Sequence, residues 1–176
     1  RRPVDAPFLA WRSRRPPGEC GGSSLDVRAW WSVASDPADL GALRGVLASH
    51  RPGPGGFGAL SEQSAHRTIE VWSETELSTL HALWWVWART GDGEMGRTVA
   101  EAARWHIAHL QPDNATNHPW AAHVFAALDA CEGVREAGLY AQTLVHNCQT
   151  ALGRPDRLSV QILADAAEAV ELMLEG

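Results

Sequence analysis

The stretch WHIAHLQPDNATNHPW, from Trp105 to Trp120, joins the two clearest helical patterns in the chain. It holds two tryptophans, three histidines and a Pro-Asp-Asn turn. Large aromatic side chains bury much area and dominate the packing of the elements that carry them. We therefore predict that the rest of the fold is arranged around this stretch.

The segment before this stretch predicts a long buried helix. Ser73, with Glu76 three residues later, has the pattern of a capping box at a helix start. From Leu80 to Ala88 the sequence is apolar nearly all round, which is typical of a helix buried on more than one side. The run from Gly91 to Gly93 predicts a left-handed helix end. We expect the helix to run from Ser73 to Arg89.

The stretch itself contains the end of one helix and the start of the next. A helix over about residues 94–110 places one apolar face on Met95, Val99, Ala102, His106 and Leu110. Pro119 predicts the next start, with His118 or Asn117 as its cap. That helix carries Trp120, His123, Val124, Ala127, Leu128 and Cys131, and Gly133 ends it.

Two more helices are predicted towards the C-terminus. The first runs over about residues 135–152, with an apolar face of Ala141, Leu144, Val145, Cys148 and Leu152 and a polar face of Gln142, Thr143, His146, Gln149 and Thr150. Gly153 and Pro155 stop it, and Asp156 caps the last helix. The packing face of the last helix is predicted to comprise Leu163, Ala166, Ala167, Val170 and Met173.

Ahead of these helices the pattern is weaker. Residues 1–24 are rich in Arg, Pro, Gly and Ser and are predicted to form an irregular arm. Residues 25–33 favour a short helix, and Asp36 with Pro37 opens a helix that reaches His50. The glycines of residues 51–60 lack the Gly-Lys-Ser/Thr ending of a phosphate-binding loop.

These patterns predict an all-α fold with a single domain over residues 25–176. Short links between successive amphipathic helices favour antiparallel hairpins. Helix-pair starts near Ser73, His118 and Asp156 recur about every 40 residues, a spacing typical of stacked hairpins. We expect about six main helices.

Composition narrows the functional classes. The chain has 176 residues, 45% of them hydrophobic, and a formal charge of −6, so a nucleic-acid partner is not expected. Its three cysteines form no CxxC pair, which favours reduced thiols and a cytoplasmic location. Its apolar runs are shorter than a membrane helix requires, so no membrane partner is expected. A homo-oligomer is compatible with these features.

The run from Leu80 to Asp113 resembles one hairpin of an α/α toroid, the barrel of helix pairs in terpenoid cyclases, prenyltransferase β subunits and several polysaccharide lyases. The resemblance lies in an aromatic residue followed by Leu, Gln, a Pro-Asp turn and a Trp, here Trp105, Leu110, Gln111, Pro112, Asp113 and Trp120. It implies helical hairpins in an incomplete ring, either an open crescent or a bundle. The DxDD and DDxxD acid clusters of cyclases are not present.

The segment ATNHPWAA, residues 115–122, is similar to the Asn-Asn-His-x-x-Trp-Ala-Ala segment of toroid-fold alginate lyases. The resemblance implies that Asn117 neutralises a uronate carboxylate and that His118 is the base that removes the neighbouring proton. The LVHN segment, residues 144–147, resembles a later part of that family. Its Tyr and Arg positions fall on Cys148 and Ala141. Alternatively, His118 or Asn117 only caps a helix.

The remaining candidates are ligand-binding residues. Uncharged hydrogen-bonding side chains suit a glycan or a peptide backbone, and tryptophans can stack on a ligand or fill a core. The predicted ligand-binding set is Trp84, Trp105, His106, Trp120, His123, Gln142 and His146. The histidines of the central stretch lack the HExxH pattern, so we expect no metal and no other cofactor.

Three functions fit this set. The first is a non-catalytic helical module that binds a glycan, peptide or protein on a concave face lined by Trp and His. The second is a lyase of the toroid type that acts on a uronate polymer, with His118 as base. The third is a cyclase-like pocket that binds an isoprenoid. We favour the first.

Overall fold

The computed structural model describes residues 60, 68–112, 116–150, 153 and 156–175. Within these residues the chain forms five helices and no strand. The helices are α4 (Ile69–Thr90), α5 (Gly93–His109), α6 (Ala122–Glu132), α7 (Arg135–Thr150) and α8 (Arg157–Glu175). The all-α prediction is confirmed for this part of the chain. The predicted arm over residues 1–24, the short helix over 25–33, the helix from Asp36 to His50 and nearly all of the loop over 51–60 lie outside it.

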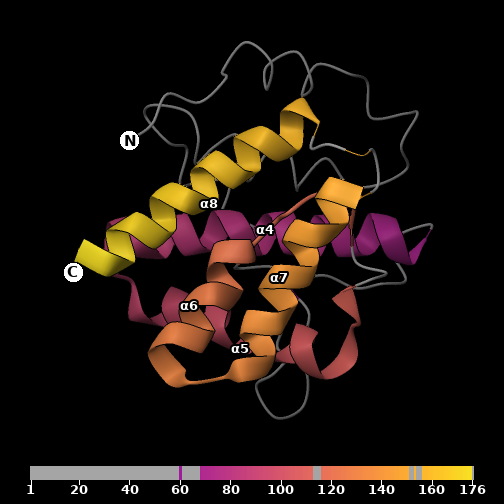
Figure 1. Ribbon diagram of the computed structural model, residues 1–176. Coiled ribbons are helices and arrows are strands. Elements are labelled where there is room, and N and C mark those ends of the chain that lie inside the picture. Colours follow the sequence, from indigo (N-terminus) through magenta and orange to yellow (C-terminus); the bar gives the residue numbers. More distant parts are fainter. Residues whose placement is uncertain (1–59, 61–67, 113–115, 151–152, 154–155, 176) are drawn as a thin grey trace, which may run out of the picture.

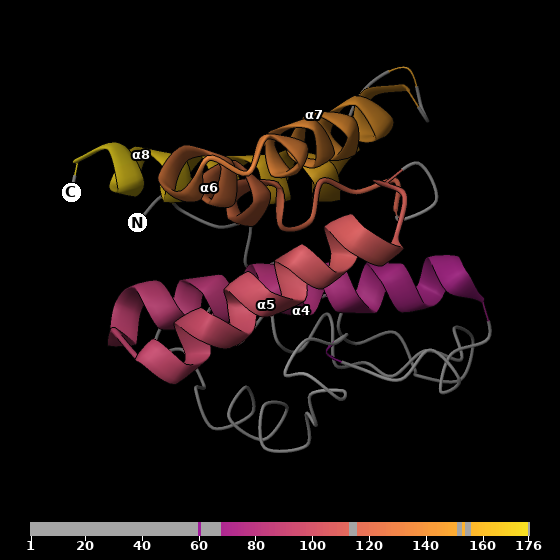
Figure 2. The ribbon, with the colours of Figure 1, turned by 90° about the horizontal axis from the view of Figure 1, so that it is seen from below.

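The five helices form two layers (Figures 1 and 2). Helices α4 and α5 lie in one layer, and α6, α7 and α8 lie in the other. Helices α4 and α5 form one antiparallel hairpin, and α6 and α7 form a second. The predicted antiparallel hairpins are therefore present. The first helices of the two hairpins begin at Ile69 and Ala122, and α8 begins at Arg157. These starts are unequally spaced along the sequence, so the predicted regular spacing is wrong.

Local sequence fixes the ends of the hairpins. Gly91 has a φ of 66° and its backbone N–H bonds to the carbonyl of Trp87, which ends α4 in the left-handed conformation. Asp92 then caps α5 by accepting from the N–H groups of Glu94 and Met95. Gly133 ends α6 with a φ of 71°. These ends lie within a residue or so of the predicted ones.

The start of α4 differs from the prediction. Thr68 is the N-cap and accepts from the N–H of Val71. Ser73 and Glu76 lie inside the helix and are fully buried. The Glu76 carboxylate accepts from the backbone N–H of Leu60 at 2.6 Å instead of returning to the N–H of Ser73. The predicted capping box is wrong because Glu76 has a partner far away in the sequence.

The start of α6 also differs. The helix begins at Ala122, and Ala121 precedes it in the left-handed conformation with a φ of 58°. Pro119 lies in a turn ahead of the helix, so neither Asn117 nor His118 caps α6. The backbone N–H of His118 is itself bonded to the hydroxyl oxygen of Thr116. The cap predicted at this position is wrong.

The core lies between the two layers and includes side chains from all five helices. Most of α4 is buried, and the buried set includes polar residues on several sides of the helix. This agrees with the prediction of a helix buried on more than one side. Gly96 allows α5 to approach α4, because a Cβ atom there would lie 2.6 Å from Nε1 of Trp87. Among the described helices, none is long and apolar enough to cross a membrane.

Candidate functional site

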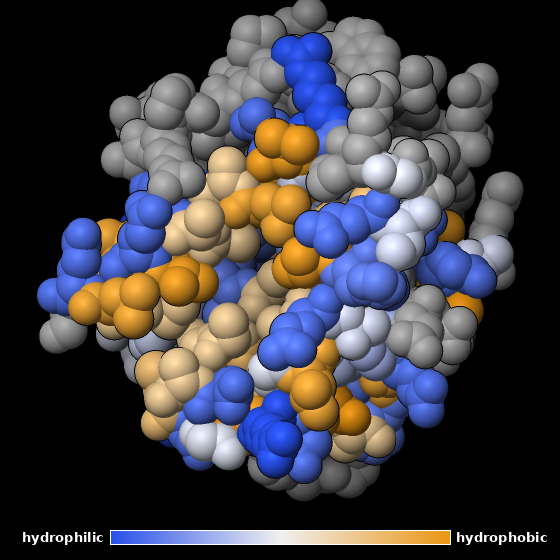
Figure 3. All heavy atoms as spheres, viewed as in Figure 1, coloured by the Kyte–Doolittle hydropathy of each residue, from blue (hydrophilic) through white to orange (hydrophobic). Residues whose placement is uncertain are grey.

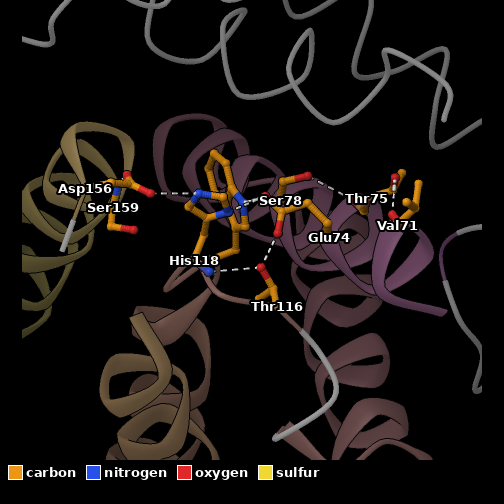
Figure 4. Close-up of polar contacts among 9 residues, drawn as sticks. Val71, Glu74, Thr75, Ser78, Thr116, His118, Asp156 and Ser159 are labelled. Carbon is orange, nitrogen blue, oxygen red and sulfur yellow. Dashed lines mark hydrogen bonds and ion pairs between the residues drawn. The ribbon is translucent and has the colours of Figure 1, made fainter. Parts of the chain in front are cut away.

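The turn from Thr116 to Ala121 brings His118 between two carboxylates (Figure 4). Nδ1 of His118 lies 2.8 Å from Oε1 of Glu74 in α4. Nε2 lies 3.3 Å from Oδ2 of Asp156, just ahead of α8. Both ring nitrogens therefore lie beside an anionic oxygen, an arrangement that favours the imidazolium, because only that form has an N–H at each nitrogen. We refer to Glu74, His118 and Asp156 as the ion triplet.

Further polar contacts hold Glu74 in place. Nε1 of Trp120 donates to Oε1 of Glu74 at 2.7 Å, and the hydroxyl of Thr116 donates to Oε2. Burial by itself would raise the pKa of Glu74, but the hydrogen bond and charge of His118, with the bonds from Thr116 and Trp120, lower it below its usual value. Glu74 is therefore ionised at neutral pH and ties the turn to α4.

Asp156 has two roles. Its Oδ1 accepts from the backbone N–H of Ser159 at 2.8 Å, which confirms the predicted cap of the last helix. Burial tends to raise its pKa, but the bonds from the Ser159 and Leu158 N–H groups and the charge of His118 lower it. The helix cap and the ion pair thus join the start of α8 to the turn.

The ion triplet does not offer a free base. A base needs an unprotonated nitrogen within reach of the substrate proton, and both nitrogens of His118 face carboxylates. Asn117, beside it, is exposed. The two carboxylates and one imidazolium carry a net charge of about −1, which repels a uronate carboxylate.

Other residues that an elimination site could use lie elsewhere. Arg104 pairs with Glu132, the last residue of α6, whereas His118 precedes the first turn of that helix. The length of the helix, roughly 1.5 Å per residue, separates the two groups. Tyr140 is buried and stacks on Phe125, with ring centroids 4.3 Å apart. Burial raises its pKa, so its hydroxyl stays protonated.

A second histidine centre lies in the interior. Nε2 of His81 in α4 is 3.1 Å from Oδ2 of Asp165 in α8. Its Nδ1 accepts from the backbone N–H of Ala121 at 3.2 Å. Because Nδ1 accepts, the proton lies on Nε2 and the ring is neutral. His81 therefore joins α4 both to the start of α6 and to α8.

His123 packs directly on this pair. Its ring centroid lies 4.4 Å from that of His81 and 4.8 Å from that of Trp84. Neither ring nitrogen has a hydrogen-bond partner in the part of the chain that the structure describes. Burial lowers the pKa of His123 well below its usual value. His123 is therefore a neutral aromatic residue of the core.

Four of the predicted ligand-binding residues lie in the interior: Trp84, His106, Trp120 and His123. Trp84 packs edge-on against Trp85, and His106 lies with its Nε2 3.5 Å from Oε2 of buried Glu76. Their burial leaves these rings unavailable to a ligand at the surface. Trp105 is half-buried and stacks on His109, with ring centroids 4.8 Å apart.

Gln142 and His146, the last two of the predicted set, are exposed on α7. The structure therefore does not bring the predicted ligand-binding residues together on one surface. Sequence reasoning did not select Glu74, Asp165 or His81, whose partners lie far away in the sequence. The signal that could have pointed to them is a charged or polar residue in an otherwise apolar helix face. In the described residues, no cluster of three or more His, Cys, Asp or Glu side chains is arranged to hold a metal ion.

Comparison of the chain with protein families, with curated proteins and with solved structures gives no match.

Proposed function

We propose that this chain is a non-catalytic helical-hairpin module of the α/α-toroid type, and that it binds a neutral glycan or a peptide backbone through α7. The observation that carries the proposal is a row of exposed, uncharged side chains on this helix: Gln142, His146 and Gln149. Their spacing of four and three residues places them on one side of the helix.

These three side chains are available to a ligand. Within the described residues, none of them makes a side-chain hydrogen bond, whereas Thr143 beside them donates to the carbonyl of Leu139. Figure 3 shows hydrophilic residues along α7 on the face that the α6–α7–α8 layer turns outward. Amide and imidazole groups both donate and accept, which suits hydroxyls and peptide groups rather than carboxylates.

Two further observations support binding rather than the alternatives. The ion triplet keeps both nitrogens of His118 against carboxylates, so the proposed lyase chemistry has no free base. The Trp84, Trp85 and His123 rings pack against one another, so their faces are used in the core rather than around an isoprenoid. The side chains of Gln142, His146 and Gln149 are exposed, and binding through them needs no catalytic base.

A binding screen tests the proposal. The full chain is tested against neutral oligosaccharides and unstructured peptides on arrays, and the hits are measured by calorimetry. We expect Gln142→Ala with His146→Ala to weaken binding at least tenfold, because two of the three hydrogen-bonding groups are lost. Gln111→Ala changes an exposed glutamine outside the row and should leave the affinity unchanged.

A uronate-polymer assay tests the catalytic alternative on the same protein. We expect no unsaturated product from the full chain. Product that appears with the full chain and disappears with His118→Ala would replace the binding proposal by a lyase. Equal loss of binding in Gln111→Ala would remove α7 as the binding surface.

A further inference from the structure

Ala121, the residue directly before α6, has a backbone conformation that is unusual for alanine. Its φ is 58°, in the left-handed region, and in the described part of the chain every other positive φ belongs to a glycine. This conformation is unfavourable for a residue with a Cβ atom and persists only where the surroundings hold it. Ala121 is fully buried, so neighbouring protein groups must hold it.

One such group comes from α4, in the other layer (Figure 2). The backbone N–H of Ala121 donates to Nδ1 of His81 at 3.2 Å. This N–H lies at the start of α6, where backbone donors have no partner within the helix. A side chain in the first turn of a helix can accept such a bond, but α6 has no side-chain cap. The imidazole of His81 therefore takes the place of a local cap.

The bond to Ala121 requires an unprotonated Nδ1. This nitrogen accepts through its lone pair, and protonation replaces the lone pair by an N–H. Two N–H groups would then face each other in the interior without a bond between them. Nε2 differs, because its N–H can donate to Oδ2 of Asp165, 3.1 Å away, whether or not Nδ1 is protonated. One added proton on His81 therefore breaks the bond to the start of α6 and keeps the bond to α8.

We propose that His81 is a proton-operated switch that holds the start of α6 at neutral pH and releases it in mild acid. In the released form, Ala121 has lost the bond that holds its left-handed conformation, and the start of α6 rearranges. The carboxylate of Asp165 stabilises the charged ring in the interior, because its charge lies beside Nε2. Helices α4 and α8 therefore stay joined.

In the described part of the chain, titratable groups face His81 from two helices. Asp165 of α8 favours the added proton through its negative charge. His123 of α6 has its ring centroid 4.4 Å from that of His81, so a proton on one ring opposes a proton on the other. His81 has a carboxylate beside it, whereas the described residues provide no hydrogen-bond partner for His123. The first proton is therefore expected on His81.

Nuclear magnetic resonance of the isotope-labelled full chain tests the switch, in a titration from about pH 8 to about pH 5, the range in which imidazoles take up protons. We expect the ring signals of His81 and the backbone amide signal of Ala121 to change with the same midpoint. Protection of the Ala121 amide against hydrogen exchange should fall at least about tenfold across that midpoint, because a buried hydrogen bond is lost. Circular dichroism should stay unchanged, because the helices remain folded.

Three variants identify the group that takes up the proton. Asp165→Asn keeps an acceptor for Nε2 but removes the charge, so it should move the midpoint to lower pH by at least about one unit. Glu94→Gln, at an exposed carboxylate of α5, is the control and should leave the midpoint unchanged. His123→Phe keeps an aromatic ring beside His81 and leaves the bond to Ala121 in place, so the coupled change of both signals should persist.

Three outcomes overturn the proposal. A His81 ring that does not titrate while the chain is folded removes the switch. An Ala121 amide that keeps its protection after His81 is charged shows that this bond does not hold the start of α6. Loss of the coupled change in His123→Phe assigns the proton to His123 instead. If Asp165→Asn does not fold, the titrations of the parent chain and of His123→Phe still decide between these outcomes.

Discussion

At the scale of single residues, histidine takes a different protonation state according to its partners. Both ring nitrogens of His118 lie beside carboxylates, whereas Nδ1 of His81 accepts from a backbone N–H. His123 is neutral because burial disfavours its charged form. Three residues of one type, all near the same turn, therefore lie in different environments.

His123 is expected to make the protein less stable in mild acid. Its pKa is lowered in the folded state, so below its ordinary value of about 6.5 the unfolded chain binds a proton that the folded chain does not. Stability is then lost as the pH falls, by up to about 1.4 kcal/mol per pH unit for one such site. His123→Phe should flatten this dependence between about pH 6.5 and 5, measured by urea unfolding.

His109→Phe is the control for that measurement, because His109 is exposed and its replacement should leave the slope unchanged. A slope that persists in His123→Phe would show that another group takes up the proton.

Asp165 is expected to stabilise the folded protein mainly through its pairing with His81. Asp165→Ala leaves the Nε2–H of a fully buried ring without this acceptor, at a cost of about 3 kcal/mol. Replacing both residues by leucine should cost less than the sum of His81→Leu and Asp165→Leu, because neither polar partner then remains alone. A double-mutant cycle by chemical unfolding measures the difference. Strict additivity would contradict the pairing.

At the scale of helices, the ends that could be predicted are those set by local sequence. Gly91, Gly133 and Asp156 each act on backbone groups within a few residues, and each has its predicted role. The starts of α4 and α6 could not be predicted, because their residues bond to distant groups. Glu76 bonds to Leu60, and His118 lies between Glu74 and Asp156.

The face of α8 shows the same limit. Apolar spacing selected Leu163, Ala167 and Val170 for the core, but Ala167 is exposed and the other two are only half-buried. The true core face contains Asp165, which is buried because His81 bonds to it. A carboxylate in sequence indicates a solvent-facing side, and only the partner 84 residues away shows otherwise. That part of the predicted packing is wrong for this reason.

The two glycines of the α4–α5 link are expected to respond in opposite directions to alanine. Gly91 has a positive φ, so Gly91→Ala should destabilise the protein by about 1 kcal/mol. Gly93 has an ordinary backbone conformation at the start of α5 and open space around it, so Gly93→Ala should stabilise by about 0.5 kcal/mol. Thermal unfolding of both variants checks the signs, and the same sign for both would contradict the described end of α4.

At the scale of the whole molecule, the ion triplet joins elements from both layers. Glu74 belongs to α4, His118 to the turn before α6, and Asp156 to the start of α8. The hairpins themselves could be predicted from helix lengths and short links. Their layering could not, because it depends on contacts such as this one between residues far apart in sequence.

The ion triplet is expected to limit stability in strong acid. The pKa values of Glu74 and Asp156 are lowered in the folded state, so their contribution is present above the unfolded values of about 4 and is lost as the pH falls through the folded ones. Glu74→Gln should lower the free energy of unfolding by about 1–2 kcal/mol at pH 7. It should also make the fall of that free energy in strong acid less steep. Glu94→Gln, at an exposed position, should do neither. An equally steep loss of stability in acid for both variants would contradict the role of Glu74 in the ion triplet.

The bond between His81 and Asp165 has a consequence for synthesis. A ribosome delivers the chain from its N-terminal side, so α4 to α7 emerge before α8. Until α8 arrives, the nascent protein has neither the Asp165 acceptor for Nε2 of His81 nor the core side chains of Leu158 and Ile162. Such an intermediate exposes apolar core residues that favour aggregation, and the arrival of the last helix ends that exposure.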